Sequence, residues 1–243
     1  MRLGTRNARN LIVKLLLENW RKFVKEEMEE PITTLRIFDF DETITHTRSN
    51  TYVTDPNGNE KTLRNQKEFE DYMKKAAKAE SIETFDPVRD LQALGYDINL
   101  KDFSIVKEPD EITVVTDILR NFPENSKTYI LTARRGNSIG PIIDYLNDIG
   151  IDTKVNDVRV MATQGESKGD VMVAMMKNKI MNNGKSNINR IEYYEDSEKN
   201  IADVKTKVCD NEEINSLKPE DFQLVIYKVV KNEGHHIIQQ IEC

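Results

Sequence analysis

An apolar run that ends in two carboxylates, at residues 35–41, constrains the fold of this chain more than any other feature. Its β-branched and aromatic residues follow Pro31 and are typical of a strand that is buried on both faces of a parallel sheet. Asp39 and Asp41 stand where this strand ends, and open α/β sheets bind ligands at the carboxyl ends of their strands. Close carboxylates repel each other. The pair therefore predicts a bound cation, unless both side chains simply cap a solvated strand end.

Short apolar strands alternate with helical segments along the rest of the chain. We expect strands at residues 128–132, 158–161 and 188–194, and helices at residues 112–122, 138–149, 169–182 and 197–207. This alternation predicts βαβ units and a doubly wound, mostly parallel α/β sheet with helices on both faces. A β-hairpin at residues 222–241 would extend the sheet, and one further helix is expected at residues 63–79.

Composition narrows the class of protein. The 243 residues carry a net charge of −7, so bulk attraction to nucleic acid or to an anionic membrane is not expected. No apolar run approaches the roughly 20 residues that a membrane span needs. Cys209 and Cys243 form no disulfide framework and indicate a reducing compartment. We therefore expect a cytoplasmic protein that does not bind membranes.

The N-terminal segment, residues 1–30, precedes the α/β pattern, which fills residues 31–243. Apolar residues at helical spacing predict an amphipathic helix over residues 8–29. Two roles stay open for this helix, which either packs on its own domain or docks on a partner protein. Membrane-surface binding is disfavoured, because anionic lipid would repel the acidic residues near the end of the segment.

Polar residues follow the other predicted strands as well. Thr132 ends the second strand and is followed by Arg134, Lys168 precedes the helix after the third strand, and Glu195 and Asp196 end the fourth strand. Because strand ends of a doubly wound sheet converge on one crevice, these side chains are expected to share a site. These strand ends supply acids for a metal, a hydroxyl, a lysine and an acid that can act as nucleophile. Such a set suits phosphoryl transfer, in which positioning and charge neutralisation supply most of the catalysis.

These residues resemble the four motifs of the haloacid dehalogenase-like (HAD) phosphohydrolase superfamily. The motifs occur in the family's order, over residues 33–210, as Asp39-Phe40-Asp41-Glu42-Thr43, Ile130-Leu131-Thr132, Lys168 and Glu195-Asp196-Ser197. The first motif is highly specific, and the ordered set is more specific still. The resemblance implies a HAD-like Rossmannoid sheet with a small cap at residues 45–112. That segment also resembles, more loosely, uncharacterised HAD-like proteins that bacteriophages encode.

The resemblance also implies a role for each motif residue. Asp39 would be the nucleophile that forms an aspartyl-phosphate, and Asp41 would protonate the leaving oxygen and then activate water. Thr132 and Lys168 would bind the phosphoryl oxygens. Mg²⁺ would be held by Asp39, by the backbone carbonyl of Asp41 and by Asp196. The cofactor that we expect is therefore Mg²⁺.

Three further residues complete this scheme. Glu195 and Asn200 are auxiliary residues, and Arg134 is a candidate for binding the substrate phosphate, although a surface salt bridge is its alternative. Many relatives have Gly where Glu42 stands and a second Asp near Asn200. Neither departure removes a core catalytic group, so the resemblance still implies an active enzyme.

We therefore expect an Mg²⁺-dependent phosphatase that hydrolyses a phosphate monoester. A small cap or partial lid leaves a site open to bulky substrates, so the candidates are a nucleotide, a nucleic-acid 3′ end and a small phosphometabolite. A fold alone does not decide function, so an alternative stays open. The alternative is a non-catalytic accessory or virion structural protein on the same fold, docked through residues 8–29. A phage-encoded protein would act in the host cytoplasm or in the virion.

Overall fold

The computed structural model describes residues 32–82, 87–163, 166–179, 188–217 and 219–242. The helix expected at residues 8–29 and the C-terminal Cys243 lie outside these ranges, so the helix stays a prediction. Cys209 is disulfide-bonded, which contradicts the reducing compartment expected from the cysteines. Within the described ranges, no helix is both long enough and apolar enough to cross a membrane.

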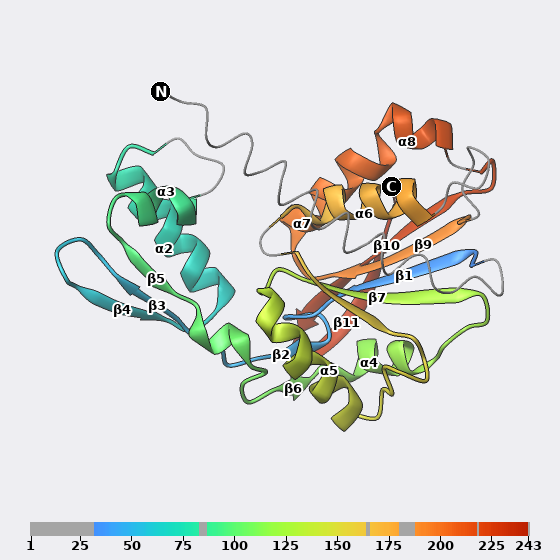
Figure 1. Ribbon diagram of the computed structural model, residues 1–243, viewed down its shortest axis with the longest axis horizontal. Helices are drawn as coiled ribbons and strands as arrows, with labels where there is room; N and C mark the ends of the chain where they lie inside the picture. Colours follow the sequence, from blue (N-terminus) through green and yellow to red (C-terminus); the bar gives the residue numbers. More distant parts are fainter. Residues whose placement is uncertain (1–31, 83–86, 164–165, 180–187, 218, 243) are drawn as a thin grey trace. The chain divides into compact units, whose positions relative to one another are not determined.

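The fold is α/β and contains a six-stranded sheet with the strand order β11-β10-β9-β1-β7-β8 (Figure 1). The strands are β1 (Thr34–Asp39), β7 (Ser126–Thr132), β8 (Arg159–Ala162), β9 (Arg190–Glu195), β10 (Gln223–Asn232) and β11 (His235–Ile241). β9 runs parallel to both of its neighbours, β1 and β10, whereas β10 and β11 are antiparallel. The predicted mostly parallel sheet is therefore confirmed.

The predicted β-hairpin is confirmed as well, and its turn is short. Asn232 pairs with His235, so only Glu233 and Gly234 form the loop. Their φ angles are 46° and 86°. Two consecutive positive φ angles are what a two-residue type I′ turn needs, and this turn matches the twist of its flanking strands.

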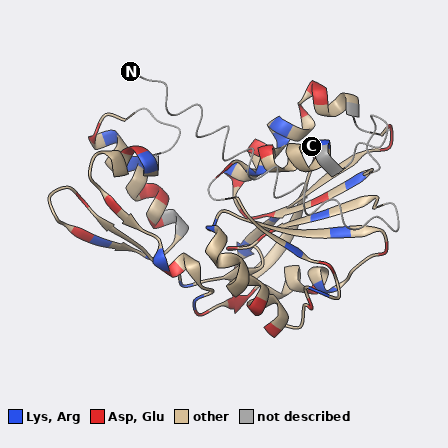
Figure 2. Ribbon diagram, viewed as in Figure 1, with Lys and Arg blue, Asp and Glu red and all other residues tan. Residues whose placement is uncertain are grey.

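The described part of the chain divides into two compact units. Of the described residues, unit 1 contains 32–38, 121–129, 166–179, 188–217 and 219–242. Its helices are α6 (Lys168–Lys179), α7 (Glu198–Val204) and α8 (Glu212–Leu217), with a π-helical turn η3 (Lys205–Cys209) after α7. Their buried apolar side chains are Met172, Met175, Met176, Ile201, Val204, Val208 and Ile214. Figure 2 shows basic and acidic residues interspersed along these helices.

Unit 2 contains Asp39–Arg120 and Ile130–Gly165. Part of it is a three-stranded sheet of order β4-β3-β5 with two helices. These elements are β3 (Thr51–Thr54), β4 (Glu60–Leu63), β5 (Asp97–Asn99), α2 (Gln66–Ala79) and α3 (Pro87–Ala93). Their apolar core consists of Val53, Leu63, Met73, Leu91 and Ile98. The insertion predicted at residues 45–112 thus has an apolar core with more elements than the one helix expected.

The remaining elements of unit 2 are short. They are β2 (Thr45–His46), β6 (Asp110–Glu111), the 3₁₀ turns η1 (Lys101–Ser104) and η2 (Gly136–Ser138), and the helices α4 (Thr113–Arg120) and α5 (Ile139–Asp148). β2 and β6 pair with each other, which brings the two ends of the insertion together. α4 and α5 lie where the sequence predicts helices.

Candidate active site

Aromatic stacking fixes the ends of the paired strands β1 and β9. The Phe38 and Tyr194 rings stack with their centroids 4.3 Å apart and an interplanar angle of 6°. The two residues are partners in the parallel register. Because side chains alternate between the faces of a strand, the residues that follow, Asp39 and Glu195, both lie on the face opposite to these rings.

Three carboxylates meet at this strand end. Ligand atoms of Asp39, Glu195 and Asp196 all lie within 4.8 Å of one another. Asp39 and Glu195 are buried, whereas Asp196 is partly exposed. A set of oxygen donors from carboxylates suits a hard divalent cation. The geometry therefore makes this acidic cluster a candidate metal site.

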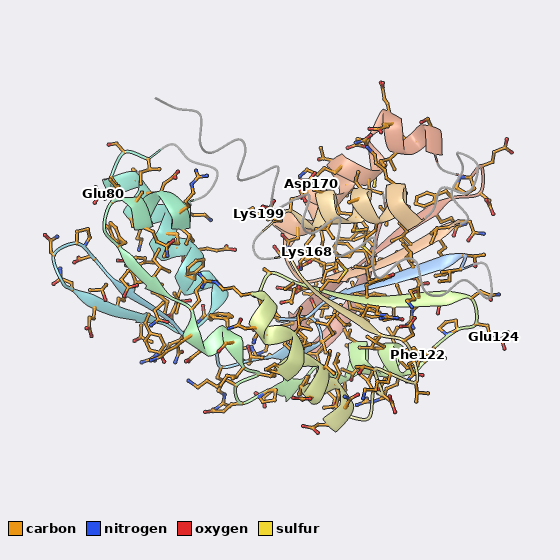
Figure 3. All side chains as sticks on the ribbon, in the orientation of Figure 1. Glu80, Phe122, Glu124, Lys168, Asp170 and Lys199 are labelled. Atoms are coloured by element: carbon orange, nitrogen blue, oxygen red, sulfur yellow. The ribbon has the colours of Figure 1, made fainter. Side chains whose placement is uncertain are left out.

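Lys168, which Figure 3 labels, is the first residue of α6 and contacts the cluster through Glu195. Its Nζ donates a hydrogen bond of 2.6 Å to Glu195 Oε2. The Tyr193 hydroxyl and the Ser197 N–H also donate to the Glu195 carboxylate. Burial opposes the charged form, but the Lys168 ammonium and these hydrogen bonds outweigh it, so the pKa of Glu195 is lowered. Glu195 is therefore held as an anion.

The Asp41 carboxylate is not part of the acidic cluster and pairs with Arg134 instead. Arg134 Nε donates to Asp41 Oδ2 at 2.8 Å, and Nη2 donates to Oδ1 at 2.6 Å. Nη2 also donates to Thr47 Oγ1 at 2.9 Å. Nη1 donates to the carbonyls of Phe103 and Ile105, at 3.2 and 2.5 Å. The five bonds match the five N–H groups of a guanidinium.

Burial distinguishes this ion pair from a surface salt bridge. The Arg134 side chain is 1% exposed. Its Cζ lies 5.3 Å from the ring centroids of both Phe40 and Phe103. A contact of Arg134 with a substrate phosphate stays a prediction, and that contact would require Arg134 to give up one of its present acceptors.

Thr132 and Asn200 stand at positions that the sequence predicts. Thr132 is the last residue of β7, the strand next to β1 in the sheet, and it is fully buried. Its Oγ1 accepts a hydrogen bond of 3.2 Å from the Arg134 N–H. Asn200 lies in the first turn of α7 and donates its N–H to Ser197 Oγ, which caps this helix. Convergence of all four motifs on one crevice stays a prediction.

Glu42 has an uncommon backbone conformation. Its φ is 59°, in the left-handed region that glycine adopts without steric cost. Many proteins of the HAD-like superfamily, which the sequence resembles, have Gly at this position. The left-handed backbone conformation gives a physical reason for that glycine. The Glu42 N–H donates to the Thr45 carbonyl at 2.9 Å, and its Oε1 lies 2.6 Å from His46 Nδ1. These contacts hold the tight turn that follows Asp41.

Sequence reasoning missed the residues that hold the start of α6. Asp203 and Lys207, in α7 and η3, bind the segment around Lys168. One signal was present in the sequence, because Gly169 follows Lys168 directly and glycine is a poor helix former. A glycine in the first turn of a helix indicates a close approach of another segment.

Comparisons with known proteins identify no family. No protein-family model matches the chain. No curated protein matches it either. Among solved structures, the crystal structure of the Legionella pneumophila effector Ceg4 is similar at 15% sequence identity, over 84% of this chain and 89% of that chain. The TM-score is 0.39, which is too low to carry an argument about fold or function.

Proposed function

We propose that this chain is a HAD-like phosphohydrolase that hydrolyses phosphate monoesters through an aspartyl-phosphate on Asp39. One observation carries the proposal, namely the acidic cluster of Asp39, Glu195 and Asp196 at the ends of two parallel strands. Lys168 contacts this cluster, as the ordered motifs predict. A carboxylate nucleophile, further acids and a lysine are the groups that phosphoryl transfer uses.

The acidic cluster fits the Mg²⁺ that this family uses. Three carboxylates at this distance repel one another, and the Lys168 ammonium offsets the charge of Glu195. A divalent cation held by Asp39 and Asp196 would offset the remaining charge with the oxygen ligands that Mg²⁺ prefers. When bound, Mg²⁺ supplies charge neutralisation for the incoming phosphate and keeps the nucleophile ionised. The backbone carbonyl of Asp41 stays its third predicted ligand.

The reaction proceeds in two displacements. Asp39 attacks the phosphorus atom, the bond from phosphorus to the leaving oxygen breaks, and the leaving oxygen takes a proton from Asp41. Water then attacks the phosphoryl group and gives a proton to Asp41, which releases phosphate and restores Asp39. Thr132 and Lys168 bind the phosphoryl oxygens during both displacements. Arg134 holds the Asp41 carboxylate in one orientation, by two hydrogen bonds.

A hydrolysis assay tests the proposal. Purified full-length protein is incubated with p-nitrophenyl phosphate in Mg²⁺ and in EDTA. Nucleotides, 3′-phosphorylated oligonucleotides and sugar phosphates then separate the three substrate classes. We expect hydrolysis that needs Mg²⁺ and that Asp39→Asn abolishes. Folded protein that hydrolyses none of these substrates in Mg²⁺ would overturn the proposal.

The alternative of a non-catalytic accessory or virion protein depends on residues 8–29, which lie outside the described part of the chain. Docking of this segment on a partner stays a prediction. The same holds for a location in the host cytoplasm or the virion. An inactive but folded protein in the hydrolysis assay would favour this alternative.

A further inference from the structure

Residues of α7 and η3 build the start of α6. The Asp170 N–H donates to Ser167 Oγ at 3.1 Å, so Ser167 caps the helix from its own chain segment. The Gly169 N–H donates to Asp203 Oδ2 at 2.9 Å. Asp203 belongs to α7 and thus supplies a second cap from another helix. Two N–H groups that an isolated helix would leave without a partner are satisfied in this way.

The two caps form one network with Lys207. Ser167 Oγ donates to Asp203 Oδ2 at 2.5 Å and accepts from Lys207 Nζ at 2.7 Å. Lys207 Nζ also lies 3.1 Å from Asp203 Oδ1 and 2.6 Å from Asp170 Oδ2. Burial opposes ionisation of Asp203, but its bonds to Ser167, Gly169 and Lys207 outweigh it, so the pKa of Asp203 is lowered. A carboxylate anion therefore faces the positive end of the α6 dipole.

Gly169 permits this close approach. A Cβ at this position would lie 2.7 Å from Asp203 Oδ2, 3.0 Å from the Asp203 carbonyl oxygen and 3.0 Å from Lys207 Cδ. Two of these atoms belong to Asp203, and one of them is backbone, so the helices would have to move apart. Glycine at the start of α6 is thus a requirement of the contact with α7.

Lys168 stands between Ser167, which caps α6, and Gly169, whose N–H is capped by Asp203. Its side chain is buried and reaches Glu195, the last residue of β9, and α7 begins three residues after Glu195. The same two chain segments are therefore joined twice, by Lys168 with Glu195 and by Gly169 with Asp203. A lysine has a flexible stem, so the position of its ammonium depends on how firmly its backbone is held.

We propose that Asp203 is a positioning residue for Lys168, because it fixes the start of α6 from which the Lys168 ammonium reaches Glu195. The effect of Asp203 on catalysis rests on the proposed function, in which Lys168 binds the phosphoryl group. The effect of Asp203 on the placement of Lys168 does not depend on that function.

Amine labelling of the full chain tests the placement without any activity. Acetic anhydride modifies lysines according to their exposure, and peptide mass spectrometry measures the rate at each lysine. We expect Asp203→Ala to raise the labelling rate of Lys168 several-fold and to leave Lys177, on the same helix, unchanged. Asp203→Asn keeps an oxygen that accepts from Gly169 and should restore most of the protection.

A matched control exists at the other end of α6. Lys177 pairs with Glu213 of α8 at 2.6 Å. Glu213→Gln removes this ion pair without touching the capped end, so it should raise the labelling of Lys177 and leave Lys168 protected. Equal rises at both lysines in Asp203→Ala would indicate general loosening of α6 and overturn the proposal. If Asp203→Ala does not fold, Gly169→Ala gives the same test.

A double-mutant cycle tests the catalytic consequence. We expect Asp203→Ala to lower kcat/KM by up to about 100-fold, as misplaced catalytic groups do. In a Lys168→Met background the same substitution should lower kcat/KM no further, because Asp203 acts through Lys168. Equal effects in both backgrounds would overturn the positioning role. A wild-type protein without phosphatase activity would refute the proposed function alone, since the labelling result still decides the placement of Lys168.

Discussion

The Arg134 guanidinium holds the Asp41 carboxylate by two parallel hydrogen bonds, from Nε to Oδ2 at 2.8 Å and from Nη2 to Oδ1 at 2.6 Å. The planar fork of an arginine matches a carboxylate in this geometry and fixes its orientation. This pairing favours the carboxylate form, and in the second displacement of the proposed reaction the Asp41 carboxylate must point at the water whose proton it takes. The pair therefore gives Arg134 an indirect role in the reaction, through the orientation of Asp41.

Arg134→Lys should lower kcat by up to about 100-fold, because a point charge cannot hold both Asp41 oxygens and small misplacements are costly. Arg134→Met should destabilise the fold by about 1–3 kcal/mol, because the backbone carbonyls of Phe103 and Ile105 lose their donor. Hydrolysis kinetics and denaturant unfolding measure the two effects. Arg135→Lys is the control, since the neighbouring Arg135 is exposed. Unchanged kinetics in Arg134→Lys would contradict the orienting role.

Asp39→Asn should abolish turnover and keep the fold. The loss should span several orders of magnitude, because the covalent route disappears and unaided hydrolysis of phosphate monoesters is among the slowest reactions known. Thermal unfolding in EDTA should be unchanged or slightly shifted upward, since one charge leaves a repelling cluster. Asp117→Asn, at a side chain that is 73% exposed, is the matched control. Activity above about a tenth of wild type in Asp39→Asn would exclude covalent catalysis by this residue.

Asp196→Ala should raise the Mg²⁺ concentration that gives half-maximal activity, because few protein ligands hold this ion. A second measurement needs no turnover. Mg²⁺ should raise the melting temperature of the wild type, since a ligand that binds only the folded state stabilises it. The shift should be smaller in Asp196→Ala. An equal shift in both proteins would mean that Asp196 is not a ligand.

Periodicity and turn chemistry were sufficient to predict the sheet from the sequence. β1 and β9 are nearly continuous apolar runs, and Glu233-Gly234 is a recognisable hairpin turn. β4 was missed, because three of its four residues are exposed and its pattern is polar. α2 begins at Gln66 rather than at residue 63, since Leu63 pairs in β4 and Asn65 caps the helix.

For the candidate site, the sequence predicted residue types better than contacts. It placed carboxylates at the ends of β1 and β9, where the structure groups them. It could not predict the pair of Arg134 with Asp41, which spans 93 residues. Its alternative of a surface salt bridge for Arg134 is wrong, because the side chain is buried. Side-chain pairing depends on loop geometry, and local periodicity carries no signal for it.

The buried pair of Lys168 and Glu195 predicts a pH dependence. The folded pKa of Glu195 lies below its ordinary value of 4.5. The pair therefore contributes stability that is fully present above about pH 4.5 and is lost as the pH falls through the lowered pKa. Denaturant unfolding in EDTA from pH 7 to pH 3 should show this loss. Glu195→Gln should flatten this part of the profile, because no proton can bind there.

Removal of Lys168 should reverse the pH dependence of the stability that comes from Glu195. Burial is the largest influence on Glu195 and raises its pKa, and the Lys168 charge is the main influence that opposes it. In Lys168→Met the pKa of Glu195 should therefore rise above 4.5, so that this carboxylate destabilises the fold at pH 7, and the destabilisation is lost as the pH falls from the raised pKa to about 4.5. The stability difference between wild type and Lys168→Met should shrink as the pH falls from 7 towards 4.

The control for this inversion is Lys177→Met. Glu213, the partner of Lys177, is 66% exposed, so it remains solvated when the lysine is removed. The stability difference between wild type and Lys177→Met should therefore be small at pH 7 and change little as the pH falls. A difference that stays constant with pH for Lys168→Met as well would mean that Glu195 is already protonated or solvated at pH 7. Its assignment as an anion held by Lys168 would then be wrong.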